Sequence, residues 1–541
     1  MVIVCILAGA ALLRLSGVSY GLPLQLIADE PQYILTGLLM AQEGTLIPPS
    51  YLRDFDKLLY NPPHVIYLFL LPFWFLRYVV EVKTLPPYFI AARIISVGTG
   101  LLTIWFAYQA ARRLWPRHRS AALFSAYFLA TSILAIAGSS SARHWPFAAA
   151  LAIYGFAALV DSRRAFSARY LRVAVIAGIG MGVNQVVGAL TAVATGWYFF
   201  IERGSVRRLA SSPWFYGSIG IFAGLTALPF LLFPHNFQAV GAELWSSVPA
   251  LGAFFVAPIA FFAPMAKSEP VLMLFALIGL AALWRANRRM FWVLLAIIIG
   301  YTELFRWVYF LRHRYLAIIA PLLAIIAGFG AAALGGYTPR RHWRSVALGV
   351  LLLVPLVVSA RFSYLLFHDD SRALARAWVE THIPEGSRVI VWAHLTRLAA
   401  ERPAIREKGL IQGDRGTEDR NEYDFPNIPW GRRFHALNLY DIRMEFFYDN
   451  IIRYACGREY DYAIIQEAGD FQTTRRRDLM MQLARGAEKL QSFGVSDEQY
   501  SVTATKFDGW PWVLFRLSEF GPPIAIYRLD RKVLCQDQES V

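Results

Sequence analysis

The sequence predicts a polytopic α-helical membrane protein with 11–13 hydrophobic helices and a C-terminal α/β domain outside the cytoplasm. Hydrophobic residues make up 56% of the 541 residues and charged residues only 17%, whereas soluble globular proteins carry about 25% charged residues. Residues 1–366 contain the long apolar stretches, and residues 367–541 are polar with mixed charge. We therefore divide the chain into a transmembrane domain, 1–366, and a soluble domain, 367–541.

Thirteen apolar stretches are candidates for membrane-spanning helices, which need about 20 mostly apolar residues. They are residues 2–20, 63–80, 87–111, 120–138, 146–160, 172–184, 187–201, 214–233, 248–264, 270–284, 291–305, 314–335 and 345–366. The stretches 63–80 and 248–264 are short or interrupted by proline, so we expect these two not to cross fully. The first stretch lacks a small-residue cleavage site, which argues against a cleaved signal peptide.

Arginine clusters predict the orientation of these helices, because cytoplasmic loops of membrane proteins are enriched in Arg and Lys. Five short loops carry 17 arginines and only two acidic residues, Asp161 and Glu202. The arginines are Arg112, Arg113, Arg117, Arg119, Arg163, Arg164, Arg169, Arg172, Arg203, Arg207, Arg208, Arg285, Arg288, Arg289, Arg340, Arg341 and Arg344. Placing all five loops in the cytoplasm predicts eleven crossings, with the N-terminus inside and residues 367–541 outside. Strict alternation would give thirteen crossings and would export at least one cluster.

The net charge of +15 does not indicate nucleic-acid binding, because the excess of basic residues is confined to the transmembrane domain. Residues 1–366 hold 29 of the 53 Lys and Arg but only 11 of the 38 Asp and Glu, a net charge of +18. Residues 367–541 hold 24 and 27 of them, a net charge of −3. This distribution is typical of a polytopic membrane protein, and we expect no nucleic-acid partner.

Helix and strand patterns alternate in the soluble part, which predicts a small α/β domain. Residues 370–381 have the pattern of a short amphipathic helix. Residues 388–392, 462–465 and 524–527 are rich in β-branched and aromatic side chains and predict strands. Residues 400–435 are rich in charge, Gly and Pro, and we interpret them as a loop.

Sequence motifs for common cofactors are absent. The chain has no HExxH, no pair of CxxC motifs, no GxxxxGK[ST] and no GxGxxG that opens a helix after a strand, so it gives no sign of nucleotide use. A divalent metal held with Asp29 or Glu30 stays open. The three cysteines, Cys5, Cys456 and Cys535, are too few for a disulfide scaffold. Whether Cys456 and Cys535 pair outside the cytoplasm also stays open.

Two adjacent carboxylates lie in the first outer loop, residues 21–62, which includes a predicted interfacial helix over 30–42. Asp29 suits the N-cap of this helix and Glu30 its first turn. Acidic residues near hydrocarbon are costly, which favours a functional role as well. Spacing alone supports capping and catalysis equally. In the catalytic interpretation Asp29 is a general base for an incoming hydroxyl, Glu30 lies beside it, and Tyr33 contacts substrate.

Two further outer segments carry candidate substrate-binding residues. Tyr60 and His64 flank a Pro-Pro pair that marks a helix start, and His64 is either a satisfied polar residue or a ligand contact. Arg143 and His144 join two spans on the outside. They are either interface anchors or binders of an anionic headgroup.

Three arginines in a late outer loop violate the positive-inside rule. Arg306, Arg312 and Arg314, followed by Tyr315, lie before another long apolar stretch. This excess of positive charge needs an anion, and the Arg side chain matches phosphate oxygens with two parallel hydrogen bonds. We interpret the three arginines as ligands of a lipid phosphate, the alternatives being an ordinary phospholipid or a bridge to Glu303.

Together these motifs resemble the GT-C class of membrane glycosyltransferases, which includes the dolichyl-phosphate-mannose protein mannosyltransferases and the bacterial aminoarabinose transferases. The resemblance rests on Asp-Glu-x-x-Tyr after the first span, the Pro-Pro helix start, Arg314-Tyr315-Leu316 with Pro321, and the segments 370–386 and 521–528. It implies a GT-C-like fold over nearly the whole chain. It also implies that Asp29, with Glu30 beside it, is catalytic and that the late arginines bind the donor phosphate.

The resemblance implies transfer of a sugar from a polyprenyl phosphate to an acceptor hydroxyl at the outer face of a bacterial plasma membrane. A single displacement at the anomeric carbon would invert its configuration. The acceptor is a lipid, a glycan or a protein. Two alternatives are a transporter or flippase of a lipid-linked sugar and a non-catalytic lipid-phosphate-binding relative. The gathering of acids at one boundary and the lack of an internal repeat disfavour the transporter.

Overall fold

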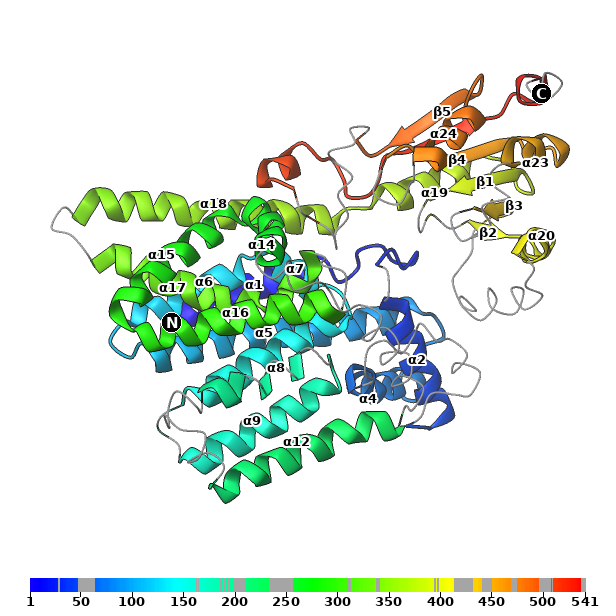
Figure 1. The fold of residues 1–541 in the computed structure, drawn as a ribbon. Coiled ribbons are helices and arrows are strands. Elements are labelled where there is room, and N and C mark those ends of the chain that lie inside the picture. Colours follow the sequence, from blue (N-terminus) through cyan, green and yellow to red (C-terminus); the bar gives the residue numbers. More distant parts are fainter. Residues whose placement is uncertain are drawn as a thin grey trace.

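The computed structural model places a bundle of helices next to a part that contains a β-sheet (Figure 1). The residues that it describes are 1–27, 30–46, 64–161, 163, 165–184, 187–188, 191–192, 194–198, 211–232, 256–308, 313–336, 341–393, 396, 398–412, 432–439, 450–468, 474–495, 507 and 509–536. The helices of the bundle run side by side along one direction, and α2 and α4 lie at the end of the bundle nearer the sheet (Figure 1). Residues far apart in the sequence are thereby brought to one end of the molecule.

The described helices of the bundle agree in position with most of the predicted stretches. They are α1 (Val2–Leu15), α2 (Glu30–Glu43), α4 (His64–Tyr78), α5 (Pro86–Leu114), α6 (Arg119–Ala130), α7 (Ile133–Ser139), α8 (His144–Leu159), α9 (Phe166–Met181), α12 (Pro213–Leu232), α14 (Val256–Ser268), α15 (Pro270–Ala286), α16 (Arg288–Val308), the 3-10 helix η2 (His313–Ile318), α17 (Ala320–Gly336) and α18 (Arg341–Phe367). The helix predicted over 30–42 is confirmed as α2, and its interfacial position stays a prediction. The stretch predicted at 120–138 is a bent pair, because α6 and α7 meet at an angle of 60°.

Length and composition identify two helical runs among the described residues that can cross a membrane, Pro86–Leu114 and Val346–His382. Two bent pairs raise this number to four if each is one span: α6 with α7, and Phe262–Ser268 with α15, which are bent by 119°. The helix α4 has 15 residues and contains Pro72, so it is about 22 Å long and shorter than a bilayer core of about 30 Å. The apolar helices mark the chain as a membrane protein, and the number of eleven crossings stays a prediction.

Glycines allow α6, α15 and α17 to approach one another closely. A Cβ on Gly279 of α15 would lie 2.0 Å from the carbonyl oxygen of Ile326 in α17. A Cβ on Gly328 of α17 would lie 2.2 Å from Ser125 Oγ in α6. Van der Waals contact between backbones drives helix association where lipid removes the hydrophobic force, so these glycines hold the centre of the bundle together.

The C-terminal part contains a six-stranded sheet in the order β2-β3-β1-β4-β6-β5. Its elements are α19 (Ser371–His382), β1 (Arg388–Trp392), β2 (Ala399–Ala400), α20 (Arg402–Gln412), β3 (Arg433–Asn438), α23 (Ile451–Gly457), β4 (Tyr462–Gln466), α24 (Thr474–Leu483), β5 (Glu488–Phe493), the 3-10 helix η4 (Pro511–Phe515), β6 (Ile524–Arg528) and α25 (Arg531–Gln536). The first four strands of this order pair in parallel, and β6 and β5 are antiparallel to their neighbours. The predicted α/β alternation and the strands at 388–392, 462–465 and 524–527 are therefore confirmed.

The loop predicted over residues 400–435 is wrong where the structure describes it. Residues 402–412 form α20, and β3 begins at Arg433. The helix begins with Arg402-Pro403, and proline suits a first helical turn. Its outer face is charged, but Ala404 and Glu407 are buried against the sheet. Packing against β3 therefore stabilises a helix whose composition alone is typical of a loop.

A buried cluster joins the first outer loop to the start of the C-terminal part. Asp370 is the N-cap of α19 and accepts hydrogen bonds from the backbone N–H of Arg372 at 3.0 Å and from its guanidinium at 2.7 and 2.8 Å. The Tyr20 hydroxyl donates to the same carboxylate. Gly521, with a φ of +112°, covers the cluster, because a Cβ there would lie 2.1 Å from Ser371 Oγ.

A second buried cluster stabilises the C-terminal sheet around Glu407 of α20. Its carboxylate accepts hydrogen bonds from the hydroxyls of Tyr460, at 3.0 Å, and Tyr454, and it pairs with Nε2 of His435 in β3. Burial alone would raise the pKa of Glu407, but the hydrogen bonds from Tyr454, His435 and Tyr460 together lower it. The cluster therefore ties α20, β3 and the segment after α23 together through one carboxylate.

We predict that the C-terminal part loses stability at acidic pH through Glu407. A carboxyl group with a lowered pKa stabilises the fold above its unfolded pKa of about 4.3, and this stability is lost as pH falls through the folded pKa. Glu407→Gln should lower the free energy of unfolding by about 1.5–3 kcal/mol at neutral pH, the typical value of hydrogen bonds to a charged group. The stability of this variant should also depend less on acidic pH than that of the wild type. Thermal unfolding as a function of pH measures both effects. Glu488→Gln, at an exposed carboxylate, is the control and should change neither.

A disulfide between Cys456 and Cys535 answers the question that the sequence left open. It joins α23 to α25 across 79 residues of sequence, with the two Cα atoms 5.6 Å apart. Cys5 in α1 is a free, exposed cysteine.

We predict that the Cys456→Ser/Cys535→Ser variant unfolds more easily than the wild type. Closing a loop of this length lowers the entropy of the unfolded chain by the equivalent of about 4 kcal/mol. The thermal unfolding midpoint should fall, and the same fall should occur when the wild type is reduced. Cys5→Ser should leave the midpoint unchanged. A wild-type chain whose gel mobility does not respond to reductant would contradict the disulfide.

Candidate functional site

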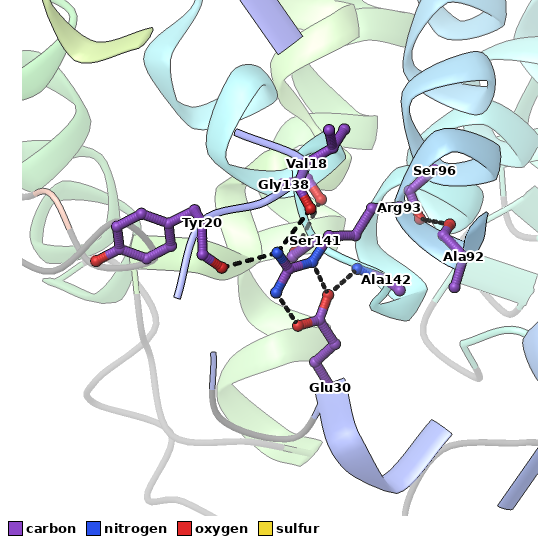
Figure 2. Close-up of polar contacts among 9 residues, drawn as sticks. All are labelled: Val18, Tyr20, Glu30, Ala92, Arg93, Ser96, Gly138, Ser141 and Ala142. Atoms are coloured by element: carbon purple, nitrogen blue, oxygen red, sulfur yellow. Dashed lines mark hydrogen bonds and ion pairs between the residues drawn. The ribbon is translucent and has the colours of Figure 1, made fainter. Parts of the chain in front are cut away.

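A buried ion pair between Glu30 and Arg93 forms the centre of the candidate site (Figure 2). Nε of Arg93 donates to Oε1 of Glu30 at 2.8 Å, and the Nη2 atom donates to Oε2 at 2.5 Å. Neither side chain is exposed to solvent. Glu30 is the first residue of α2, and Arg93 lies in the first half of α5. The pair therefore fixes the start of α2 against the bundle.

The same pair holds two other segments by backbone hydrogen bonds. The Arg93 guanidinium donates to the carbonyl oxygens of Val18 at 2.9 Å and Tyr20 at 2.8 Å. Oε1 of Glu30 accepts the backbone N–H of Ala142 at 2.7 Å. Figure 2 shows these contacts converging on the ion pair. One pair of side chains thus joins the end of the first span, the start of α2 and the segment before α8.

These contacts give Glu30 a different role from the predicted catalytic one. Both of its carboxylate oxygens are occupied by Arg93, and one also accepts from Ala142. This burial and these hydrogen bonds favour a positioning role for Glu30, and its catalytic role stays a prediction. One signal of this partner is visible in the sequence, since an arginine inside a predicted span requires a counter-charge. Asp29, which precedes Glu30, lies outside the described residues.

A chain of aromatic contacts connects the Glu30 region to the late outer segment. The hydroxyl of Tyr33 in α2 and Nδ1 of His144 share a hydrogen bond of 2.8 Å. The centres of the His144 and Trp145 rings are 3.8 Å apart, and the centres of the Trp145 and Tyr315 rings are 5.0 Å apart. The hydroxyl of Tyr301 in α16 donates to the backbone oxygen of Tyr315. Three of the predicted binding residues, Tyr33, His144 and Tyr315, therefore belong to one cluster.

Arg143 lies in the interior at this cluster and is only 3% exposed. Its guanidinium carbon is 5.9 Å from the centre of the Trp145 ring, a cation–π distance. A residue that merely anchors a helix at the lipid surface would be exposed. The burial of Arg143 therefore favours an internal anion-binding or packing role over the interface anchor.

His64 is held at the end of α9 and not among the aromatic contacts of Tyr33 and His144. Its backbone N–H donates to the carbonyl oxygen of Gly182 at 3.0 Å. A Cβ at position 182 would lie 2.0 Å from the His64 ring, so only glycine leaves room for this ring. The contact explains the last glycine of the Gly-x-Gly-x-Gly run over 178–182. It supports the interpretation of His64 as a packed polar residue.

The remaining predicted site residues are not fully described. Tyr60 and Arg312 lie outside the described residues, as do the side chains of Arg306 and Arg314. The backbone places Arg306 in the last turn of α16 and Arg314 in η2, immediately before Tyr315. In the described part of the chain, no three or more His, Cys, Asp or Glu side chains form a group that could hold a metal ion.

A small apolar groove with a volume of about 50 Å³ lies beside the Tyr301–Tyr315 contact. It lies between α8, α16 and the start of α17, and Thr191, Ala194 and Thr195 also line it. Its lining includes Tyr301, Ile318, Pro321 and Phe156. A groove with such walls suits a hydrocarbon chain much better than a sugar.

No protein-family model matches the chain, and no curated protein sequence matches it. Solved structures of GT-C glycosyltransferases are similar to it at low sequence identity. ArnT from Cupriavidus metallidurans bound to undecaprenyl phosphate is 15% identical with a TM-score of 0.48, and the match covers 97% of both chains. The oligosaccharyltransferase from Archaeoglobus fulgidus in complex with Zn and sulfate is 11% identical with a TM-score of 0.44, covering 86% of this chain and 68% of that one. The mycobacterial arabinofuranosyltransferase AftD is 16% identical with a TM-score of 0.42, covering 97% of this chain and 40% of that one.

We predict that removal of Arg93 destabilises the protein strongly. Arg93→Met leaves the Glu30 carboxylate buried without a counter-charge, which should cost about 3–5 kcal/mol. Arg528→Met, which removes an exposed ion pair with Glu488, should cost about 0–1 kcal/mol. Thermal unfolding of both variants in lipid nanodiscs gives the comparison.

The double variant Glu30→Gln/Arg93→Met tests the cause of the loss. The neutral amide needs no counter-charge, and its oxygen can still accept the Ala142 N–H, so the double variant should be more stable than Arg93→Met alone. A double variant no more stable than the single one would show that the lost contacts to Val18 and Tyr20, and not the unpaired charge, cause the destabilisation.

Proposed function

We propose that the protein is a membrane glycosyltransferase that moves a sugar from a polyprenyl phosphate to an acceptor hydroxyl outside the cytoplasm. The observation that carries this proposal is the meeting of three outer segments at one place. The start of α2, the segment before α8 and the residues around Tyr315 are linked by the Glu30–Arg93 pair and by the Tyr33–His144–Trp145–Tyr315 contacts. The start of α2 and the residues around Tyr315 carry motifs that resemble those of GT-C enzymes.

Asp29 is the residue that we propose as general base. It directly precedes Glu30, whose backbone position is held by Arg93. In the reaction the Asp29 carboxylate takes the proton of the acceptor hydroxyl, and the hydroxyl oxygen attacks the anomeric carbon. The bond from that carbon to the phosphate oxygen breaks, and its electron pair leaves with the polyprenyl phosphate. A single displacement of this kind inverts the anomeric configuration.

Positive charge is the second requirement of this mechanism, because negative charge builds up on the departing phosphate. Prearranged cations stabilise such a charge without reorganisation. We assign this role to Arg306, Arg312 and Arg314, which flank Tyr315 in the sequence. Arg143 is a fourth candidate, since it is buried beside Trp145, whose ring contacts Tyr315.

The apolar groove beside Tyr301 supports a donor with a lipid tail. It starts where the Tyr301 hydroxyl contacts the Tyr315 backbone and is lined by α8, α16 and α17. The disulfide between Cys456 and Cys535 supports a location of the C-terminal part in an oxidising compartment, and hence the proposed reaction at the outer face of the membrane.

We predict that Asp29→Asn removes transferase activity while the protein stays folded. Loss of a general base should lower kcat by roughly 10²–10⁴-fold, with little change in KM because the asparagine has the same shape. Transfer of radiolabelled sugar from a panel of polyprenyl phosphates by the purified protein measures this. Glu43→Gln changes an exposed carboxylate on the same helix and should keep full activity.

Glu30→Gln separates positioning from catalysis. Its amide oxygen can keep the Ala142 hydrogen bond, so this variant should be less stable than the wild type yet more active than Asp29→Asn. Full activity of Asp29→Asn would refute Asp29 as the base. Movement of labelled donor across the membrane without release of polyprenyl phosphate would instead support a transporter.

A further inference from the structure

A short segment of the C-terminal part packs along the side of α18, away from the sheet. The 3-10 helix η4 lies on this helix, where the orange-red ribbon runs beside α18 in Figure 1. Val513 and Leu514 of η4 are buried in one apolar cluster with Val358 and Phe362 of α18. The contact is therefore a tight apolar interface and not a loose approach of two surfaces.

We infer from its position along α18 that η4 lies at the depth of the membrane. Pro511 lines a small cavity together with Val354 and Val358. These two valines lie thirteen and nine residues before Phe367, the last residue of α18, which is about 14–20 Å along the helix axis. The bilayer core is about 30 Å thick, and the run Val346–His382 is one of the two that can span it. The segment thus lies beside the apolar span and not beyond its end.

The backbone of the segment is satisfied in a way that suits such a depth. Arg361 of α18 donates to the carbonyl oxygens of Leu514, at 3.1 Å, and Leu517. Within η4 the N–H of Val513 donates to the carbonyl oxygen of Trp510 at 3.0 Å. Backbone that is not α-helical is tolerated at membrane depth only where protein satisfies it, and α18 with Arg361 meets this condition.

The outer side of the segment presents three large aromatic side chains. Trp510, Trp512 and Phe515, here called the aromatic wedge, are 41%, 52% and 51% exposed. The two tryptophan rings are stacked, with centres 4.7 Å apart. Exposed apolar residues of α18, among them Leu353 and Val357, extend the same kind of surface. Water is a costly environment for such a patch, whereas tryptophan is enriched where acyl chains meet headgroups.

We propose that the aromatic wedge is a lipid-binding element that inserts the C-terminal part into the membrane leaflet on its own side. Its partner is the boundary between acyl chains and headgroups of bilayer lipid. The buried side of η4 holds α18, and the wedge contacts the lipid around it. This inference does not depend on sugar transfer.

Spin labels test the proposal in the full-length protein in nanodiscs. Trp512→Cys and Phe515→Cys are each labelled in a Cys5→Ser background, since the other two cysteines are paired. Leu410→Cys on α20, at a side chain that is 81% exposed, is the control. Labels at 512 and 515 should collide more often with oxygen, which concentrates in lipid, than with a water-soluble nickel complex. The label at 410 should show the reverse.

Two outcomes overturn the proposal. Equal access of the nickel complex at 512 and 410 would place the wedge in water. Low access of both reagents at 512, with spin–spin broadening, would show that a second copy of the chain covers it. If the cysteine variants fail to fold, lipids brominated on their acyl chains give a second measurement. These lipids should quench the tryptophan fluorescence of the wild type more than that of the double variant Trp510→Phe/Trp512→Phe. The control Trp378→Phe should be quenched as strongly as the wild type. Equal quenching of all three proteins would overturn the proposal.

Discussion

The arrangement of the outer end of the bundle depends on the ion pair between Glu30 and Arg93. Both side chains are fully buried, so neither charge is tolerable without the other. Apolar residues of similar volume could fill the space, but apolar contacts are non-directional and would not determine which backbone groups meet. The pair does so, because it accepts the Ala142 N–H and donates to the carbonyl oxygens of Val18 and Tyr20. We infer that its main effect is to fix the positions of segments distant in the sequence.

The segment that ends at Tyr20 transmits this constraint to the C-terminal part. Its backbone is held by Arg93, and the Tyr20 side chain donates to Asp370, which Arg372 neutralises with two hydrogen bonds. The two buried charge clusters are therefore joined through a single residue. A shift of α19 would pull on Tyr20 and, through Arg93, on the start of α2. The start of α2 is in this way coupled to the C-terminal part.

Features with local signals could be predicted from the sequence, and features that depend on distant contacts could not. The helix α19 was predicted over 370–381 from its apolar period. Asp370 is its N-cap, and the Asp370 side chain accepts a hydrogen bond from the backbone N–H of Arg372. The partner of Glu30 is 63 residues away; an arginine within an apolar stretch signals a counter-charge but does not identify it. The helix α20 was missed because packing against β3, and not its composition, makes it a helix. The three outer segments were expected on one side of the membrane, but their aromatic contacts arise from packing that no local pattern encodes.

The C-terminal part is built into the bundle at two sites, which limits how it can move. One is the Tyr20–Asp370 cluster, and the other is the contact of η4 with α18, which buries Leu514 and Leu517 against Phe362. A rotation of the whole part away from the bundle would break a buried charged hydrogen bond and expose a large apolar cluster at the same time. Each of these costs several kcal/mol, more than an equilibrium between two well-populated states permits. We therefore infer that the C-terminal part does not swing away from the bundle as a whole.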